Sequence, residues 1–364
     1  MASYRSLRDL DWGLLLTALL ICSIGVLQIY SATQDVEVWA SAWWKQILYI
    51  LIGCALLWII ASIDYHTLLG QIPVIYVTTI VLLVAVLLFG KSIAGARRWI
   101  QLPGFHLQVS EFAKLMIVLL VARFLTEIRS DRLEFREFLK LGALVALPWF
   151  LVMREPDLGT SLTYLPILAI GVFLAGLRLR YIVALTVLGI GLSWTAYHYL
   201  LQDYQRSRIE SFLNPESDPR GSGYQVVQSK IAIGSGGMWG RGVTQGSQTQ
   251  LRFLPVPHTD FIFATYGEEH GFVGVVILLV LYFGLLLQIV QNAQTAPDRA
   301  GMYICMGVAS LFLFHLLVNV GMVAGLMPVT GIPLPLMSSG GSNMLSTFLM
   351  LGLVNNVRLR RFVN

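Results

Sequence analysis

Long, nearly uncharged apolar runs restrict the fold of this chain more than any other feature of its sequence. A helix that spans a membrane needs roughly 20 predominantly apolar residues, and runs of this kind recur between Trp12 and Val357. Of the 364 residues, 56% are hydrophobic and only 12% are charged, whereas a soluble domain carries about 25% charged residues. The sequence therefore predicts an all-α, polytopic membrane protein in which residues 1–364 form a single integral membrane domain.

About ten of these runs are predicted to be transmembrane helices. The seventh and eighth runs are separated by residues 202–260, a segment far longer than the usual connection between helices. This segment mixes aliphatic and aromatic residues with Gly and basic residues, so we expect a large, ordered extracytoplasmic loop. The predicted spans cover 12–32, 43–62, 72–90, 111–126, 140–153, 159–176, 181–201, 261–290, 300–326 and 340–357.

Basic residues in the short connections predict the orientation. With an even number of spans, most of them fall on one side of the membrane, and Lys- and Arg-rich connections stay in the cytoplasm. Both termini are therefore predicted to be cytoplasmic, and segments 91–110 and 202–260 extracytoplasmic. The basic residues that carry this inference are Arg5, Arg8, Arg129, Arg132, Arg136, Lys140, Arg178, Arg180, Arg299, Arg358, Arg360 and Arg361.

Asp260 is the first candidate for chemistry. It directly precedes the apolar run that begins at Phe261, and His258 lies two residues before it. Ionisable groups at such a border are costly and usually serve catalysis or transport. An Asp in this position can also simply cap the following helix, and His258 can be a proton partner or a polar loop residue. Both interpretations of each residue remain open at this point.

Charged residues around the start of the fourth span form a second group. Arg98, followed by Trp99, can anchor the chain at the membrane interface or contact lipid phosphates, whose geometry a guanidinium matches. Glu111 and Lys114 are three residues apart, so they share one face of a helix and can pair. Such a pair can lower the cost of inserting both charges or can serve the reaction.

Two further candidates lie next to predicted helices. Asp157 precedes the sequence LGTS and is a candidate N-cap, with Thr160 at the third helical position. Residues 223–233 can form an amphipathic interfacial helix with Lys230 on its polar face. Both segments are predicted to lie on the extracytoplasmic side.

Further sequence features bear on the predicted site and on the kinds of site that can be excluded. Glu268, about two turns beyond Asp260, is expected to face protein or water, for instance as the partner of a basic residue. The segment 330–342, rich in Pro, Gly and Ser, is expected to re-enter or cover a cavity, since irregular backbone at membrane depth must be buried in protein or line a wet space. Nothing in the sequence indicates a zinc site or a nucleic-acid surface. The cysteines all lie in apolar runs, which argues against disulfides: Cys22, Cys54 and Cys305.

Several runs together resemble the SEDS family of bacterial cell-wall proteins, and its elongation branch more than its division branch. The similarity extends over all the predicted spans. Two positions depart from the family pattern: Val109 stands where many members have Pro, and Ser339 where many have an aromatic residue. The runs that carry the resemblance are QSKIAIGSGG (228–237), LPVPHTDFIFA (254–264), EEHG (268–271) and GIPLPLMSSGGS (331–342).

The resemblance implies a peptidoglycan glycosyltransferase in the bacterial inner membrane that polymerises lipid II outside the cytoplasm. Its partner would be a class B penicillin-binding protein, a transpeptidase. The family's essential aspartate falls on Asp260, the candidate general base. A divalent cation, Mg²⁺ or Mn²⁺, could bridge the substrate pyrophosphate and nearby carboxylates. The resemblance places substrate-binding positions on Arg98, Glu111, Lys114, Asp157, Lys230 and His258.

Two other classes of function remain open from the sequence. Many spans with intramembrane charges also fit a transporter that flips lipid II. A non-catalytic activator of the transpeptidase is the third hypothesis, and it predicts that Asp260 can be replaced without cost. The predicted crowding of charges at the extracytoplasmic edge favours the enzyme, because a transporter should carry charges along a path through the membrane midplane.

Overall fold

The computed structural model describes residues 10–93, 96–102, 105–128, 132–199, 201, 203–218 and 221–361. Three basic residues used to predict the orientation, Arg5, Arg8 and Arg129, lie outside the described residues. The described chain is mostly helical, which confirms the predicted fold class.

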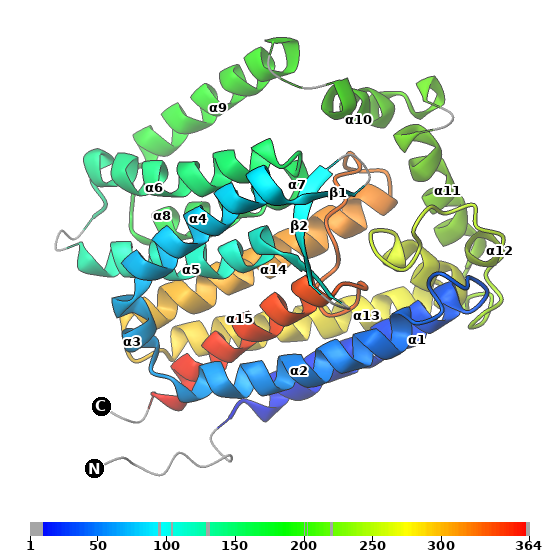
Figure 1. Cartoon of the computed structure of the whole chain (residues 1–364), viewed down its shortest axis with the longest axis horizontal. Coiled ribbons are helices and arrows are strands. Elements are labelled where there is room, and N and C mark those ends of the chain that lie inside the picture. The colour runs from blue at the N-terminus through cyan, green and yellow to red at the C-terminus, as the bar shows by residue number, and fades with distance from the viewer. Residues whose placement is uncertain are drawn as a thin grey trace.

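Long helices running side by side form the body of the molecule (Figure 1). Each predicted span coincides with one of these helices, except that 159–176 is divided into two helices at Thr163. Among the described residues, five helices are long and apolar enough to cross a membrane: α1, α2, α4, α13 and α14. The exact number of spans remains a prediction. The long helices are α1 (Trp12–Thr33), α2 (Ala42–Ser62), α4 (Ile72–Phe89), α5 (Val109–Glu127), α6 (Phe135–Arg154), α7 (Leu158–Leu162) with α8 (Tyr164–Leu174), α9 (Leu179–Tyr199), α13 (Ile262–Gln294), α14 (Arg299–Val323) and α15 (Gly341–Leu359).

The core is built around α14 and α15. Helix α14 packs against α5, α8 and α13, and α15 packs along α2. Two glycines allow the α2–α15 contact: a Cβ at Gly53 would lie 2.6 Å from the Phe348 ring, and one at Gly352 would lie 3.0 Å from the Leu57 carbonyl oxygen. The helices therefore approach as closely as small residues permit, which suits a bundle held by van der Waals packing.

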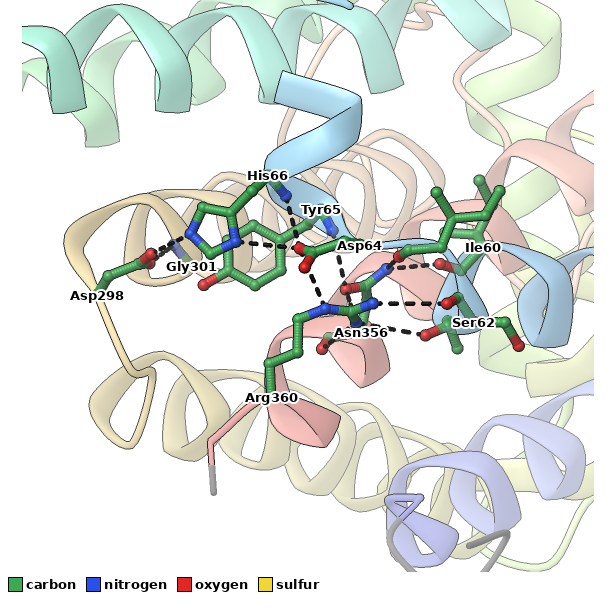
Figure 2. Close-up of polar contacts among 11 residues, drawn as sticks. Ile60, Ser62, Asp64, Tyr65, His66, Asp298, Gly301, Asn356 and Arg360 are labelled. Atoms are coloured by element: carbon green, nitrogen blue, oxygen red, sulfur yellow. Dashed lines mark hydrogen bonds and ion pairs between the residues drawn. The ribbon is translucent and has the colours of Figure 1, made fainter. Parts of the chain in front are cut away.

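One end of the bundle joins the start of α1 to the end of α15 (Figure 1). Asp11 caps α1 and accepts hydrogen bonds from Arg358 at 2.7 Å and Asn292 at 2.8 Å. Figure 2 shows a neighbouring cluster that ties the short helix α3 (Tyr65–Gly70) to α14 and α15. There the two ring nitrogens of His66 lie 3.0 Å from Asp64 and 2.7 Å from Asp298.

A small antiparallel sheet between α4 and α5 was not predicted from the sequence. It has the order β1 (Lys91–Ile93), β2 (Ala96–Leu102) and β3 (Phe105–Gln108). Pairing between the strands satisfies the backbone polar groups of this segment. In this sheet Trp99 faces Gln108 across the β2–β3 pair.

The described residues between α9 and α13 include α10 (Asp203–Leu213), a 3₁₀ turn η2 (Pro215–Ser217), α11 (Ser222–Ser235) and α12 (Ser247–Gln250). Helix α11 is the predicted amphipathic helix, and it packs on α13. These elements lie at the end of the bundle where α13 begins (Figure 1).

A buried glutamate holds this segment on α13. The Glu268 carboxylate accepts hydrogen bonds from the backbone N–H of Gln248 at 2.7 Å, the backbone N–H of Thr249 at 3.0 Å and the Thr249 hydroxyl at 2.7 Å. Glu268 thus faces protein, as expected, and the described residues include no basic ion-pair partner for it. The first N–H groups of a helix have no acceptor within that helix, and the Glu268 carboxylate supplies one for Gln248 and Thr249 of α12.

Replacing Glu268 by Ala should therefore destabilise the fold. Two buried backbone N–H groups would lose their acceptor, at a cost of about 2–4 kcal/mol. Thermal unfolding in detergent should show a lower midpoint than for the wild type. The matched control is Glu216→Ala, since Glu216 is exposed; an equal midpoint shift for both variants would contradict this role for Glu268.

Candidate active site

A cavity of about 780 Å³ lies at the end of the bundle where α13 begins. Its walls come from segments that are far apart in the sequence: the start of α2, strands β2 and β3, the start of α5, α7, the segment before α13, and the loop before α15. The structure thus gathers four of the predicted site residues around one space. Those four are Arg98, Glu111, Asp157 and Asp260.

Asp260 lies at the junction between the long loop and α13. Its backbone carbonyl accepts a hydrogen bond from Asn319 at 3.0 Å. The helix that follows has Phe261 as its N-cap, with no side-chain capping hydrogen bond, so the alternative in which Asp260 caps α13 was wrong. Its carboxylate lines the cavity and is only partly accessible. Burial raises the pKa of Asp260, and the nearby Arg208 and Arg98 oppose this increase.

Two guanidinium groups provide positive charge near this carboxylate. Arg98, on β2, lies with one terminal nitrogen 3.5 Å from the Asp157 carboxylate and donates to the carbonyl of Pro156. Arg208, on α10, donates to the Thr330 carbonyl at 3.2 Å. Arg208 was not among the predicted site residues, although it lies in the DYQRSRIE run of the long loop. A basic residue in such a loop gives no sign of its target until the fold is known.

Asp157 is the N-cap of α7, as predicted. One carboxylate oxygen accepts from the Thr160 N–H at 3.1 Å, and the other accepts from the Thr160 hydroxyl at 2.9 Å and from Gln108 at 2.9 Å. Gln108 comes from β3, so Asp157 links the small sheet to α7. These contacts fix the carboxylate in the cavity wall beside Arg98.

Glu111 and Lys114 form the predicted ion pair on α5, with Nζ 2.8 Å from the carboxylate. Both side chains are buried. Glu111 also accepts from Ser346 on α15 at 3.3 Å. Glu111 lines the cavity, whereas Lys114 does not. The pair therefore places a carboxylate in the cavity wall, and the buried Lys114 ammonium balances its charge.

Besides Lys114, two predicted site residues do not line this cavity. Lys230 is exposed on α11 and lies against Gly325 at the end of α14. His258 is buried, with its ring centroid 4.7 Å from that of Trp39. Burial lowers the pKa of His258 to about 4, so its ring is neutral at pH 7. Its backbone carbonyl accepts from the Ser339 N–H at 3.0 Å, which ties the two loops of the site together.

Side-chain donors hold the loop before α15 in place. The carbonyls of this loop lie outside helices and strands. Four of them accept hydrogen bonds from side chains, in agreement with the rule that buried backbone groups are paired. The donors are Arg208 to Thr330, Asn319 to Ile332, His315 to Pro333 and Tyr282 to Pro335. The prediction that this segment covers a cavity is confirmed, because Gly331, Pro333 and residues 339–343 line it.

Glu155 is a further residue that the sequence did not mark as functional. It is fully buried next to Asp157, and neither carboxylate oxygen has a hydrogen-bond partner among the described residues. Burial, together with the Asp157 charge, raises the pKa of Glu155 to about 8, and Arg98 opposes this. At neutral pH this carboxyl is therefore largely protonated and adds little negative charge to the cavity wall.

The protein groups alone do not form a metal site. Within the described part of the chain, no three His, Cys, Asp or Glu side chains are arranged to hold a metal ion. The Asp157 oxygens are already hydrogen-bonded by Thr160 and Gln108. A divalent cation at this site would need ligands from the substrate as well.

Comparisons with known proteins give a consistent result. The profile of the FtsW/RodA/SpoVE family, described as cell cycle proteins, matches residues 11–361. Peptidoglycan glycosyltransferase MrdB of Escherichia coli K12 is 39% identical over 354 residues, covering 97% of this chain and 94% of that protein. Peptidoglycan glycosyltransferase RodA of Treponema pallidum is 35% identical over 430 residues, covering 98% and 99%.

The fold agrees with these matches. A chain from a solved peptidoglycan synthase complex, in which polymerization and crosslinking are coordinated, superposes with a TM-score of 0.84 at 33% identity, covering 98% of this chain and 99% of that one. The family profile and both relatives extend over almost the whole sequence, including every segment that lines the cavity. The chain therefore belongs to the FtsW/RodA/SpoVE family, the SEDS family that its motifs resemble.

Proposed function

We propose that this protein is a peptidoglycan glycosyltransferase that polymerises lipid II at the outer face of the bacterial cytoplasmic membrane, with Asp260 as general base. The single observation that carries the proposal is that Asp260 and Arg98 line the same cavity, with Arg208 near enough to act on the charge of Asp260. A partly accessible carboxylate next to fixed cations is what transfer of a sugar from a pyrophosphate requires. The relatives MrdB and RodA are likewise peptidoglycan glycosyltransferases.

The reaction joins two lipid-linked sugars. The acceptor hydroxyl oxygen of one lipid II forms a bond to the anomeric carbon of the growing strand, while the bond from that carbon to the pyrophosphate oxygen breaks. The hydroxyl proton passes to the Asp260 carboxylate, and the polyprenyl pyrophosphate leaves with the bonding electron pair. General-base catalysis of this kind typically contributes about 10²–10⁴-fold.

Charge on the leaving group needs cations that are already in place. Arg98 is held by Asp157 and the Pro156 carbonyl, and Arg208 by the Thr330 carbonyl. Fixed guanidinium groups stabilise developing negative charge without reorganisation during the reaction, and their planar fork suits phosphate oxygens. Lys230, a predicted substrate-binding residue, is left out because it is exposed on α11 against Gly325 and is not among the charged groups that act on Asp260.

A partner protein completes the proposed activity. The similar chain in the peptidoglycan synthase complex belongs to an assembly that combines polymerization with crosslinking. We therefore propose that this chain works with a class B penicillin-binding protein, which cross-links the strands. Both termini would then be cytoplasmic and the cavity extracytoplasmic.

Purified protein in vesicles distinguishes this function from lipid transport. Lipid II supplied on the cavity side should be converted to glycan polymer by the wild type. Flipping of lipid II between leaflets without polymer would favour a transporter. Polymer formation that survives loss of the Asp260 carboxylate would favour a non-catalytic activator, with another enzyme making the polymer.

The pH dependence of the reaction tests the electrostatics of Asp260. Its pKa is raised by burial, so the base is protonated at a higher pH than an ordinary Asp, and kcat/KM should fall as the pH drops through that raised value. Arg208 lowers this pKa, so Arg208→Ala should move the acid limb of the profile to higher pH. The measurement is the pH profile of kcat/KM for both proteins. A limb that stays in place would mean that Arg208 does not act on the titrating base.

A further inference from the structure

One face of α14 contacts both loops that form the site. Asn319 donates from its amide nitrogen to the Asp260 carbonyl at 3.0 Å and to the Ile332 carbonyl at 2.8 Å. His315, one helical turn earlier, lies with Nδ1 2.9 Å from the Pro333 carbonyl. Both side chains are buried. Neither residue belongs to the motifs that identified the family.

His315 also reaches the Glu111–Lys114 pair. A carbonyl only accepts hydrogen bonds, so the contact to Pro333 requires the proton on Nδ1 and leaves Nε2 as an acceptor. Nε2 lies 3.4 Å from the Lys114 ammonium. A single ring therefore connects the loop before α15 to the ion pair on α5.

The loop that these residues hold forms part of the wall around Asp260. Gly331 has a φ of +70°, and a Cβ at this position would lie 3.3 Å from an Asp260 carboxylate oxygen. Movement of residues 331–333 would therefore change the space next to the base. A misplacement of about 1 Å at a reacting group can cost about 10²-fold in rate.

We infer that Asn319 and His315 form an α14 clamp, which fixes the Asp260 segment and the loop 331–333 relative to each other and to the Glu111–Lys114 pair. These are positioning residues, since their hydrogen bonds go to backbone carbonyls and to Lys114. The inference rests on the proposed glycosyltransferase function. It adds that α14, a core helix, determines the position of Asp260 relative to the cavity wall.

Asn319→Leu tests the clamp, because Leu has similar volume and no hydrogen-bond donor. We expect kcat for lipid II polymerisation to fall about 10–100-fold with KM little changed, since substrate contacts remain. The matched control is Asn292→Leu: Asn292 is also buried but donates to Asp11 at the opposite end of the bundle. That variant should lower the unfolding midpoint and leave kcat per folded protein unchanged. Equal kcat values for the two variants would overturn the clamp.

A conservative change at His315 provides a second arm. His315→Gln retains an amide donor for the Pro333 carbonyl, whereas His315→Leu has none. The Gln variant should therefore keep a larger share of kcat than the Leu variant. Equal losses would mean that the ring acts through packing alone, which would remove His315 from the clamp.

Hydrogen exchange tests the clamp without relying on activity. Asn319→Leu should increase deuterium uptake in peptides covering 254–262 and 328–342, and Asn292→Leu should leave both unchanged. Unchanged uptake in Asn319→Leu would overturn the clamp even if the wild type polymerised lipid II. Failure of the wild type to polymerise lipid II would instead remove the proposed function, and the exchange result would still decide whether the clamp exists.

Discussion

Replacing Asp260 by Asn should reduce polymerisation of lipid II by about 10²–10⁴-fold, the usual contribution of a general base. Asn has nearly the same shape but cannot take the proton of the acceptor hydroxyl. The fold should survive, because the Asp260 side chain does not cap α13 and its backbone carbonyl keeps the bond from Asn319. Polymer length and yield from purified protein and lipid II provide the measurement.

The control for this substitution is Glu216→Gln, which removes an exposed carboxylate from the same long segment. It should polymerise lipid II at the wild-type rate. If Asp260→Asn also retains the wild-type rate, the carboxylate is not the base. Equal unfolding midpoints for the two variants are needed to assign the loss to chemistry.

Loss of the Arg208 side chain should be the second large effect. Removing one fixed donor for developing negative charge typically costs about 10²–10³-fold in kcat, so Arg208→Ala should approach that range. Arg208→Lys should recover only part of the rate, because an ammonium keeps the charge but not the planar fork. The measurement is single-turnover polymerisation of lipid II, which separates the chemical step from product release.

Arg206 on the same helix offers a matched control. It donates to the Tyr197 carbonyl, with its guanidinium 5.6 Å from the Tyr197 ring, whereas Arg208 donates to the Thr330 carbonyl and acts on the charge of Asp260. Arg206→Ala should therefore leave kcat unchanged. A comparable loss in both variants would indicate that α10 needs its arginines for folding rather than for the leaving group.

Sequence patterns that extend over a few residues predicted the helices, one helix cap and one ion pair. Apolar runs of sufficient length located the helices, because each such run must form its backbone hydrogen bonds internally. The Asp157 cap followed from an Asp placed three residues before Thr160. The Glu111–Lys114 pair followed from i, i+3 spacing on a helix.

The remaining features depend on contacts between distant segments. Arg208 is 52 positions from Asp260 in the sequence, and only the path of the long loop brings it near the base. The positions of Lys230 outside the cavity and of Arg98 on a strand depend on the same tertiary arrangement. The clamp of His315 and Asn319 could not be predicted from the sequence either, because a polar residue in an apolar helix gives no indication of which group accepts its hydrogen bond.

Ser339 illustrates where a motif and a structure give different information. In the sequence it was a departure from the family pattern, without a physical consequence. In the structure its backbone N–H donates to the His258 carbonyl at 3.0 Å, and the residue lines the cavity. The backbone contact is available to any residue except Pro, so this departure leaves the connection between the two loops intact.

The most direct test of the account is a structure of the Asp260→Asn variant with lipid II bound. The account predicts an acceptor sugar hydroxyl within hydrogen-bond distance of the side chain at position 260, and a pyrophosphate bound by Arg98 and Arg208. A pyrophosphate held elsewhere, for example at Lys230, with the side chain at 260 far from any sugar hydroxyl, would contradict it.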